Sequence, residues 1–205
     1  MVVRIANFSA TPQVGDFSSK HQRKNFMTLY SYKNIVPDIH DSVFIAPGAK
    51  IIGDVEIGRD SSVWFQTVLR GDVAEIRIGE RTNIQDLCMG HVARDTPLII
   101  GNGVTIGHNC CVHGCTIGDG CLIGMGAVLL NNSVIGEGCV IAAGALVLEN
   151  TIIEPYSLVT GSPGKVKKVY ENRDEIDQRL KKASDNYVGH AREFGSNDLF
   201  YELKK

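Results

Sequence analysis

The sequence lacks the features that mark membrane proteins, exported proteins and nucleic-acid-binding proteins. Its net charge is −2 over 205 residues, and it has no basic stripe with interleaved aromatic residues, so we expect no nucleic-acid partner. No apolar run approaches the roughly 20 residues of a membrane helix, so we expect no membrane partner either. The N-terminal stretch MVVRIANFSATPQVGDFSSKHQRK has no continuous apolar segment of the kind found in secretory signals. These absences favour a cytoplasmic protein.

Cysteine is too sparse for a disulfide-stabilised fold. The chain has six cysteines and no CxxC pair, and free thiols are the default in a cytosolic protein. Three of the six lie with two histidines in the stretch GHNCCVHGC, residues 107 to 115. This stretch raises the question of whether cysteine or histidine binds a metal here.

Aliphatic residues recur at every sixth position over most of the chain. The longest run is Ile117, Ile123, Leu129, Ile135, Ile141, Val147, Ile153 and Val159, and further runs start at Ile39, Ile78 and Ile100. Among these lead positions only Gly90 is not aliphatic. A period of six fits neither a helix nor an ordinary strand, and it is typical of a parallel β-helix in which three hexads close one triangular coil. The predicted fold class is therefore an all-β solenoid with a C-terminal α-helix.

The other positions of the hexad are also specialised. Small or β-branched residues fill the fifth position, where we place Val73 and Thr116 among others. Glycine often follows the lead, and we expect it to take unusual backbone angles there. Four cysteines share the fifth position and are interpreted as core packing: Cys88, Cys110, Cys121 and Cys139. Cys111 and Cys115 fall outside that position, so we expect them at the surface.

The period divides the chain into three parts. Residues 1–35 are predicted to be an N-terminal arm, the first 26 of them flexible, and residues 36–164 form the β-helix. Residues 165–205 form a C-terminal helix and tail, with the helix running from Lys165 to about Phe194. Apolar residues at helical spacing, including Ile176 and Leu180, give this helix one face that can cover the outside of the solenoid.

The period also assigns polar side chains to faces of the solenoid. Arg70, His91 and His113 each directly follow a lead and lie one coil apart, so they should stack at the strand spacing of about 4.8 Å. Asp86 and His108 share another position on the preceding face. The other histidines, His21, His40 and His190, have no partner in this register, and we expect them at the surface. The period breaks by insertions before Ile78 and Ile100 and by a deletion before Ile117, and insertions in solenoids loop outward.

This register predicts a homotrimer with metal sites between subunits. Within one chain, His108 lies around a corner, roughly 16 Å of extended chain from His113. In a three-fold trimer His108 would instead approach His91 and His113 of the partner subunit, and Asp86 would approach Arg70. Three imidazoles with an open fourth position are typical of catalytic zinc, which lowers the pKa of its bound water to about 7. Fe(II) and Co(II) would also accept imidazole ligands.

The same residues resemble those of a known family. VWFQTVLRGD (63–72), RTNIQD (81–86), His91 and GHNCCVHGCTIGDGCLIGMGA (107–127) are similar to the γ-class carbonic anhydrases, over about residues 28–190. The resemblance implies a left-handed β-helix, a homotrimer and reversible hydration of CO2 to bicarbonate at zinc held by His91, His113 and the next chain's His108. It implies in addition roles for five residues. Gln85 orients the zinc-bound hydroxide, Arg70 and Asp86 pair across the interface, Asn83 supports them, and Tyr187 reaches the site from the helix.

The chain departs from this family where protons are transferred. Val73 follows the RGD motif in place of an acidic residue, and Arg94 lies where a proton-transferring glutamate would be. Buffer, Glu75 or Asp95 could take the proton instead. Three other functions therefore stay open. They are hydrolysis of an acyl-CoA thioester at the same metal, acyl transfer from coenzyme A by a hexapeptide-repeat enzyme, and metal or siderophore binding by a trimer without this activity.

Overall fold

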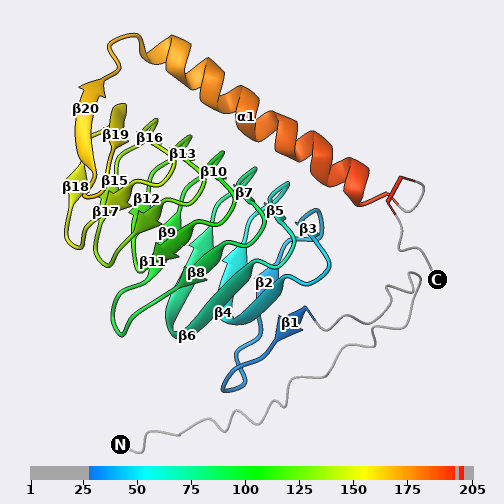
Figure 1. Ribbon diagram of the computed structural model, residues 1–205. Helices are drawn as coiled ribbons and strands as arrows, with labels where there is room; N and C mark the ends of the chain where they lie inside the picture. The colour runs from blue at the N-terminus through cyan, green and yellow to red at the C-terminus, as the bar shows by residue number, and fades with distance from the viewer. Residues whose placement is uncertain (1–27, 197–198, 201–205) are drawn as a thin grey trace, which may run out of the picture.

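The computed structural model describes residues 28–196 and 199–200, and these form a triangular β-solenoid with one long helix beside it (Figure 1). The predicted flexible arm of residues 1–26 lies outside the described residues. The predicted hexapeptide β-helix with a C-terminal helix is confirmed.

Short parallel strands build the three faces of the solenoid. The helix face consists of β3 (Phe44–Ile45), β5 (Ser62–Val63), β7 (Asn83–Ile84), β10 (Thr105–Ile106), β13 (Leu122–Ile123), β16 (Val140–Ile141) and β19 (Ser157–Thr160). The histidine face contains β1 (Leu29–Tyr30), β8 (Met89–His91), β11 (Cys111–His113), β14 (Val128–Leu129) and β17 (Leu146–Val147). The third face contains β2 (Asp38–Ile39), β9 (Leu98–Ile100), β12 (Thr116–Ile117), β15 (Val134–Ile135) and β18 (Ile152–Ile153). Two long strands, β4 (Lys50–Ile57) and β6 (Val68–Ile78), join the histidine face to the third face in one 12-stranded sheet.

The lead residues fill the interior of the solenoid. Ile117 pairs in register with Ile100 below it and Ile135 above it, and all three are buried. Gly90 is the one lead without a side chain, and its neighbours take up the space. A Cβ at this glycine would lie 2.7 Å from Leu69 Cδ2 and 3.2 Å from Leu98 Cδ2. The core therefore stays closed where the aliphatic period fails.

The glycines that follow the leads have a different role from the one predicted. They do not have positive φ angles, but they allow successive coils to approach closely. At Gly124 a Cβ would lie 2.4 Å from the backbone nitrogen of Ala143. The positive φ angles occur two residues later, at positions such as Asp60, Asn109 and Gly126, where the chain turns a corner.

The two insertions loop outward, as predicted. Residues 72–75 bulge from β6, because Gly71 pairs with Gly53 while Ile76 pairs with Val55. Residues 92–97 form a small loop closed by a bridge between Ala93 and Thr96.

The breaks in the period also move the small interior position. Ile76 and Cys115 are buried in it, whereas Val73 and Thr116 are exposed. The predictions that Cys115 lies at the surface and that Val73 and Thr116 fill the small position are therefore wrong. The small interior position lies two residues before the next lead residue, as Cys115 lies before Ile117. Each break in the period changes the distance between successive leads, so counting forward from the preceding lead gives the wrong residue. The four cysteines predicted to pack in the core are buried as expected.

The C-terminal segment begins with a strand, so the prediction of a helix from Lys165 is wrong. Residues Lys165–Val169 form β20, which pairs antiparallel with β19 and covers the open edge of the last coil. The helix α1 spans Arg173–Phe194, and the side chain of Asn172 caps it by accepting the Glu175 N–H at 3.2 Å. This cap, and the pairing of β20, place the start of the helix later than its composition indicates.

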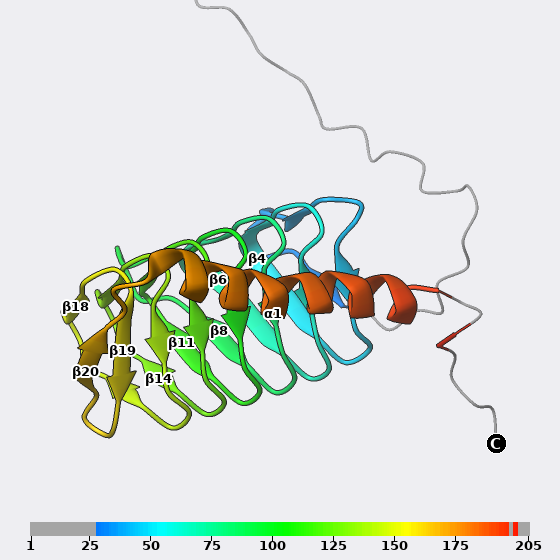
Figure 2. The ribbon, with the colours of Figure 1, turned by 90° about the horizontal axis from the view of Figure 1, so that it is seen from above.

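Helix α1 runs back along the helix face, as Figures 1 and 2 show from two directions. It buries Ile176, Leu180, Ser184, Val188 and Ala191, which confirms that it covers the solenoid. Its composition makes it too polar to cross a membrane, and the described residues contain no other helix that could.

Candidate metal centre

Strands β8 and β11 bring His91 and His113 side by side on the histidine face. The two residues are in register, and Arg70 of β6 is the next partner in the column, which confirms the predicted stack. The Nδ1 atom of His91 lies 3.0 Å from the Nε2 atom of His113. We call the group formed by Arg70, Asp72, His91, His113 and Asn131 the His91 cluster.

Hydrogen bonds assign the protonation of both rings in the His91 cluster. His91 Nε2 lies 3.0 Å from Oδ1 of Asp72, and a carboxylate can only accept, so this nitrogen carries the proton. His113 Nδ1 lies 2.6 Å from Oδ1 of Asn131, whose amide nitrogen points to Glu149 at 3.5 Å. The two remaining nitrogens are unprotonated in the neutral rings, and they are the two that face each other. Two lone pairs so placed repel unless a cation lies beside them.

Burial and nearby charges both act on the pKa values of His91 and Asp72. Burial lowers the pKa of His91, as do the positive charge of Arg70 and the neighbouring His113, and these outweigh the opposing effect of Asp72. Burial alone would raise the pKa of Asp72, but hydrogen bonds from His91 and Arg70 lower it overall. His91 is thus neutral and Asp72 ionised near neutral pH, which is the state in which histidine binds metals.

The third histidine belongs to a second group around the corner, which we call the His108 cluster: Asn83, Gln85, Asp86, His108 and Tyr187. His108 Nδ1 lies 2.7 Å from Oδ2 of Asp86, so its Nε2 atom is the one available to a ligand. Gln85 donates to Asn83 Oδ1 at 3.1 Å, and Asn83 donates to Thr105 at 2.9 Å. Both amides are buried, so their orientations are fixed.

Tyr187 joins the His108 cluster from α1. Its ring packs edge-on against Trp64, with 5.5 Å between the ring centroids. Burial raises the pKa of Tyr187, and the negative charge of Asp86 raises it further. The ring of His190, three residues later, packs edge-on against Tyr187, with 5.6 Å between the ring centroids. His190 and His40 are exposed, as predicted, while His21 lies outside the described residues.

One chain therefore assembles two clusters and no complete metal site. Within residues 28–196 and 199–200, no three histidine, cysteine, aspartate or glutamate side chains are arranged to hold a metal ion. Arg70 pairs with Asp72 of its own chain, and Asp86 pairs with His108. The shared three-histidine site and the pairing of Arg70 with Asp86 across an interface stay predictions.

Sequence reasoning missed Asp72 and Asn131, which orient the two imidazoles. Asn131 lies in the coil after His113, two residues after the lead Leu129, which pairs with Val112. Counting from the leads could therefore have placed it beside His113. Asp72 begins the bulge of β6, where the register gives no position.

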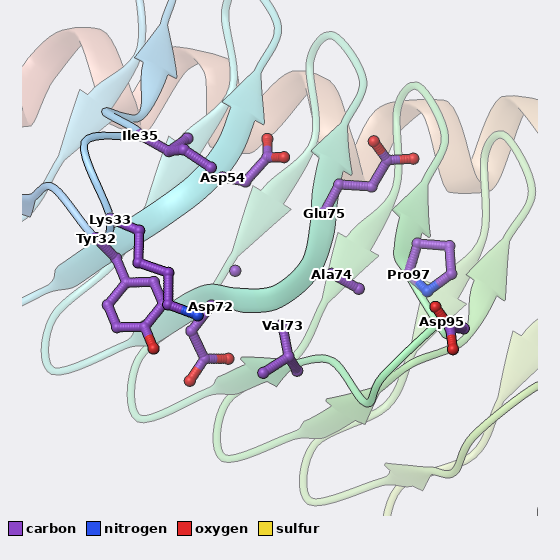
Figure 3. A pocket seen from close by; sticks show the side chains of 11 residues that line it. Tyr32, Lys33, Ile35, Asp54, Asp72, Val73, Ala74, Glu75, Asp95 and Pro97 are labelled. Carbon is purple, nitrogen blue, oxygen red and sulfur yellow. The ribbon is translucent and has the colours of Figure 1, made fainter.

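A cavity of about 430 Å³ adjoins the His91 cluster at Asp72 (Figure 3). The bulge of β6 and the loop of residues 92–97 form its walls, together with the turn around Lys33. Glu75, one of the residues expected to take up protons, is held by Arg77 at 2.9 Å. Arg77 also holds Asp54 at 2.7 Å. Asp95, the other candidate, lines the cavity.

Several relatives match most of the chain. It is 53% identical over 150 residues to a probable carbonic anhydrase of Methanocaldococcus jannaschii, covering 73% of this chain and 93% of that protein. It is 46% identical to a carbonic anhydrase of Geobacillus kaustophilus, covering 78% of this chain and 87% of that protein. It is also 39% identical to the mitochondrial gamma carbonic anhydrase 2 of Arabidopsis thaliana, covering 80% of this chain. The chain belongs to the γ-class carbonic anhydrase family. It spans 44% and 61% of the lengths of the mitochondrial gamma carbonic anhydrases 1 and 2 of Arabidopsis thaliana.

The γ-class family shares its solenoid with transferases. The family model for the bacterial transferase hexapeptide (six repeats) matches residues 37–71, 97–131 and 114–149. A solved structure of a hexapeptide transferase family protein from Anaplasma phagocytophilum is 39% identical, with a TM-score of 0.76, covering 80% of this chain and 96% of that one. An N-acyltransferase from Bacillus cereus, 17% identical with a TM-score of 0.55, shares the fold alone.

Proposed function

We propose that this member of the γ-class family catalyses the reversible hydration of CO2 to bicarbonate, at a zinc site shared between subunits of a homotrimer. One observation carries the proposal: Nδ1 of His91 and Nε2 of His113, the ring nitrogens not bonded to Asp72 or Asn131, face each other 3.0 Å apart on one side of the solenoid. The carbonic anhydrase names of the relatives support it.

The donor set fits zinc. Two imidazole nitrogens bound to one tetrahedral zinc at 2.0–2.1 Å lie about 3.3 Å apart, close to the separation of His91 Nδ1 and His113 Nε2. His91 and His113 of one chain and His108 of the partner subunit would hold the metal, and iron or cobalt would accept the same donors. When bound, the metal acts as a Lewis acid and makes a water acidic near neutral pH.

The chain's own residues position the reaction. Asp72 and Asn131 hold the two imidazoles in the tautomers that leave one nitrogen of each for the ligand. Asp86 does the same for His108. The buried amide of Gln85, fixed by Asn83, orients the attacking water. Tyr187 closes the His108 cluster on the side of α1. Arg70 and Asp86 pair across the interface and align the two faces.

The surface of the histidine face supports a subunit contact. One outward residue per coil, just before each lead, is apolar over five successive coils: Val68, Met89, Cys111, Val128 and Leu146. This column runs beside Arg70, His91 and His113, and a contiguous apolar strip of this kind is typical of an interface. A partner subunit that covers it would bring its own His108 to the pair.

Mixed trimers test the shared site. His91→Ala and His108→Ala are each expected to abolish metal binding and CO2 hydration. When the two variants are refolded together at equal amounts, about a quarter of the sites should be intact, because each site takes its ligands from two chains. Zinc content and hydration rate of the mixture measure this recovery. No recovery, with trimers formed, would show that each site lies within one chain.

The likeness to a hexapeptide transferase family protein supports a second candidate, acyl transfer from coenzyme A. That function leaves the facing nitrogens of His91 and His113 without a role. Metal analysis with CO2-hydration and acetyl-CoA assays on the purified protein separates the candidates. Acyl transfer by metal-free protein would replace the proposal. Zinc-loaded protein without hydration activity, at alkaline pH and high buffer, would favour thioester hydrolysis or a binding role.

A further inference from the structure

Hydration of CO2 releases a proton. Four carboxylates line the cavity beside the His91 cluster, but Asp54, Asp72 and Glu75 are already held in ion pairs with arginine. Glu75 is held by Arg77 at 2.9 Å.

Beside the His108 cluster, α1 carries a further imidazole. Asp86 holds His108 at 2.7 Å and accepts the Phe65 N–H at 3.2 Å, and the ring of the adjacent Trp64 packs against Tyr187 with 5.5 Å between the ring centroids. The ring of Tyr187 contacts the ring of His190, at 5.6 Å between centroids. His190 is exposed. These contacts place the exposed ring of His190 next to the side chains that surround the His108 cluster.

We propose that His190 is the proton-transfer residue of this enzyme, an inference that rests on the proposed function. In the hydration direction, the water oxygen forms a bond to the carbon of CO2, and the proton lost by the water passes through solvent to an unprotonated nitrogen of His190. The imidazolium formed in this way releases the proton to a buffer base, which restores the neutral ring. Dehydration of bicarbonate runs the same steps in reverse. Histidine suits this role because it exchanges protons readily near neutral pH.

Several charged groups of α1 and of the turns beneath it pair with partners other than His190: Asp60 with Arg192, Arg81 and Lys181 with Asp185, and Asp86 with His108.

The test compares His190→Ala with His40→Ala in the metal-loaded protein. His40 is an exposed histidine in the first coil, at the corner between the third face and the helix face, with Nδ1 2.9 Å from Ser42. At low buffer concentration, kcat for CO2 hydration should fall about tenfold or more in His190→Ala, the scale of a lost proton-transfer group. His40→Ala should match the wild type. The kcat/KM for CO2 should not change, and saturating imidazole buffer should restore kcat in His190→Ala.

The possible outcomes separate the two proposals. If His190→Ala matches the wild type at low buffer, the role of His190 is refuted while the proposed function stands. If kcat stays low at saturating imidazole, or kcat/KM falls as well, His190 acts through the structure around Tyr187 and the inference is also refuted. No hydration by the wild type at any buffer concentration would overturn the proposed function and this inference with it.

Discussion

Removing the charge of Asp72 should weaken metal binding without disturbing the fold. Asp72 accepts from His91 Nε2 at 3.0 Å and pairs with Arg70, so it fixes the tautomer that, under the proposed function, leaves His91 Nδ1 for the metal. Loss of such a supporting group typically costs 10- to 100-fold in metal affinity, about 1.4 to 2.7 kcal/mol. Asp72→Asn keeps an acceptor oxygen, so its loss of zinc affinity should be near tenfold. Asp72→Ala removes the acceptor, so its loss of zinc affinity should be near a hundredfold.

Competition with a zinc chelator at fixed pH measures both affinities. Asp54→Asn is the matched control, because Asp54 lines the same cavity and binds Arg77 but no histidine. It should bind zinc like the wild type. The reasoning is refuted if Asp72→Ala stays within about twofold of the wild type, or if Asp54→Asn loses as much affinity as Asp72→Asn, since a second-sphere effect is expected to be specific to the histidine.

Three further predictions concern stability and reactivity. Gly124→Ala should destabilise the protein by about 2 kcal/mol or more in chemical denaturation, because its Cβ would meet backbone 2.4 Å away. Gly189→Ala, in α1 with open space around the Cβ, should stabilise it by up to about 1 kcal/mol, and equal effects would contradict the packing argument. Burial raises the pKa of Cys115 to about 12, so iodoacetamide should label it only after unfolding, and labelling of the folded protein seen by mass spectrometry would contradict this. Hydrogen bonds from Lys181 and Arg81 lower the pKa of Asp185. The stabilisation from these bonds is thus present above the ordinary pKa of 3.8, and it is lost as the pH falls through the lowered pKa of folded Asp185. Asp185→Asn should therefore flatten the acid side of a plot of Tm against pH. An unchanged plot would refute this.

Much of the fold could be predicted because the six-residue period counts coils. Ile117 and Leu129 were assigned to the interior by counting, and both are buried. Counting failed at the breaks, where Cys115 took the small interior position that the preceding lead assigned to Thr116. Composition failed at Lys165–Val169, since it favours a helix there but the unpaired edge of β19 binds that segment as a strand.

The sequence by itself determined which side chains share a column. Equal spacing from the leads placed Arg70, His91 and His113 on one face and His108 on another, because each hexad advances the chain by one face of the triangle. The tertiary structure alone decided which nitrogens of His91 and His113 face each other, because Asp72 and Asn131 bond the other two. That depends on Asp72, in a bulge without register, and on Asn131, from the next coil. Ring orientation follows from hydrogen bonds between side chains of different coils, and no periodicity in the sequence encodes those bonds.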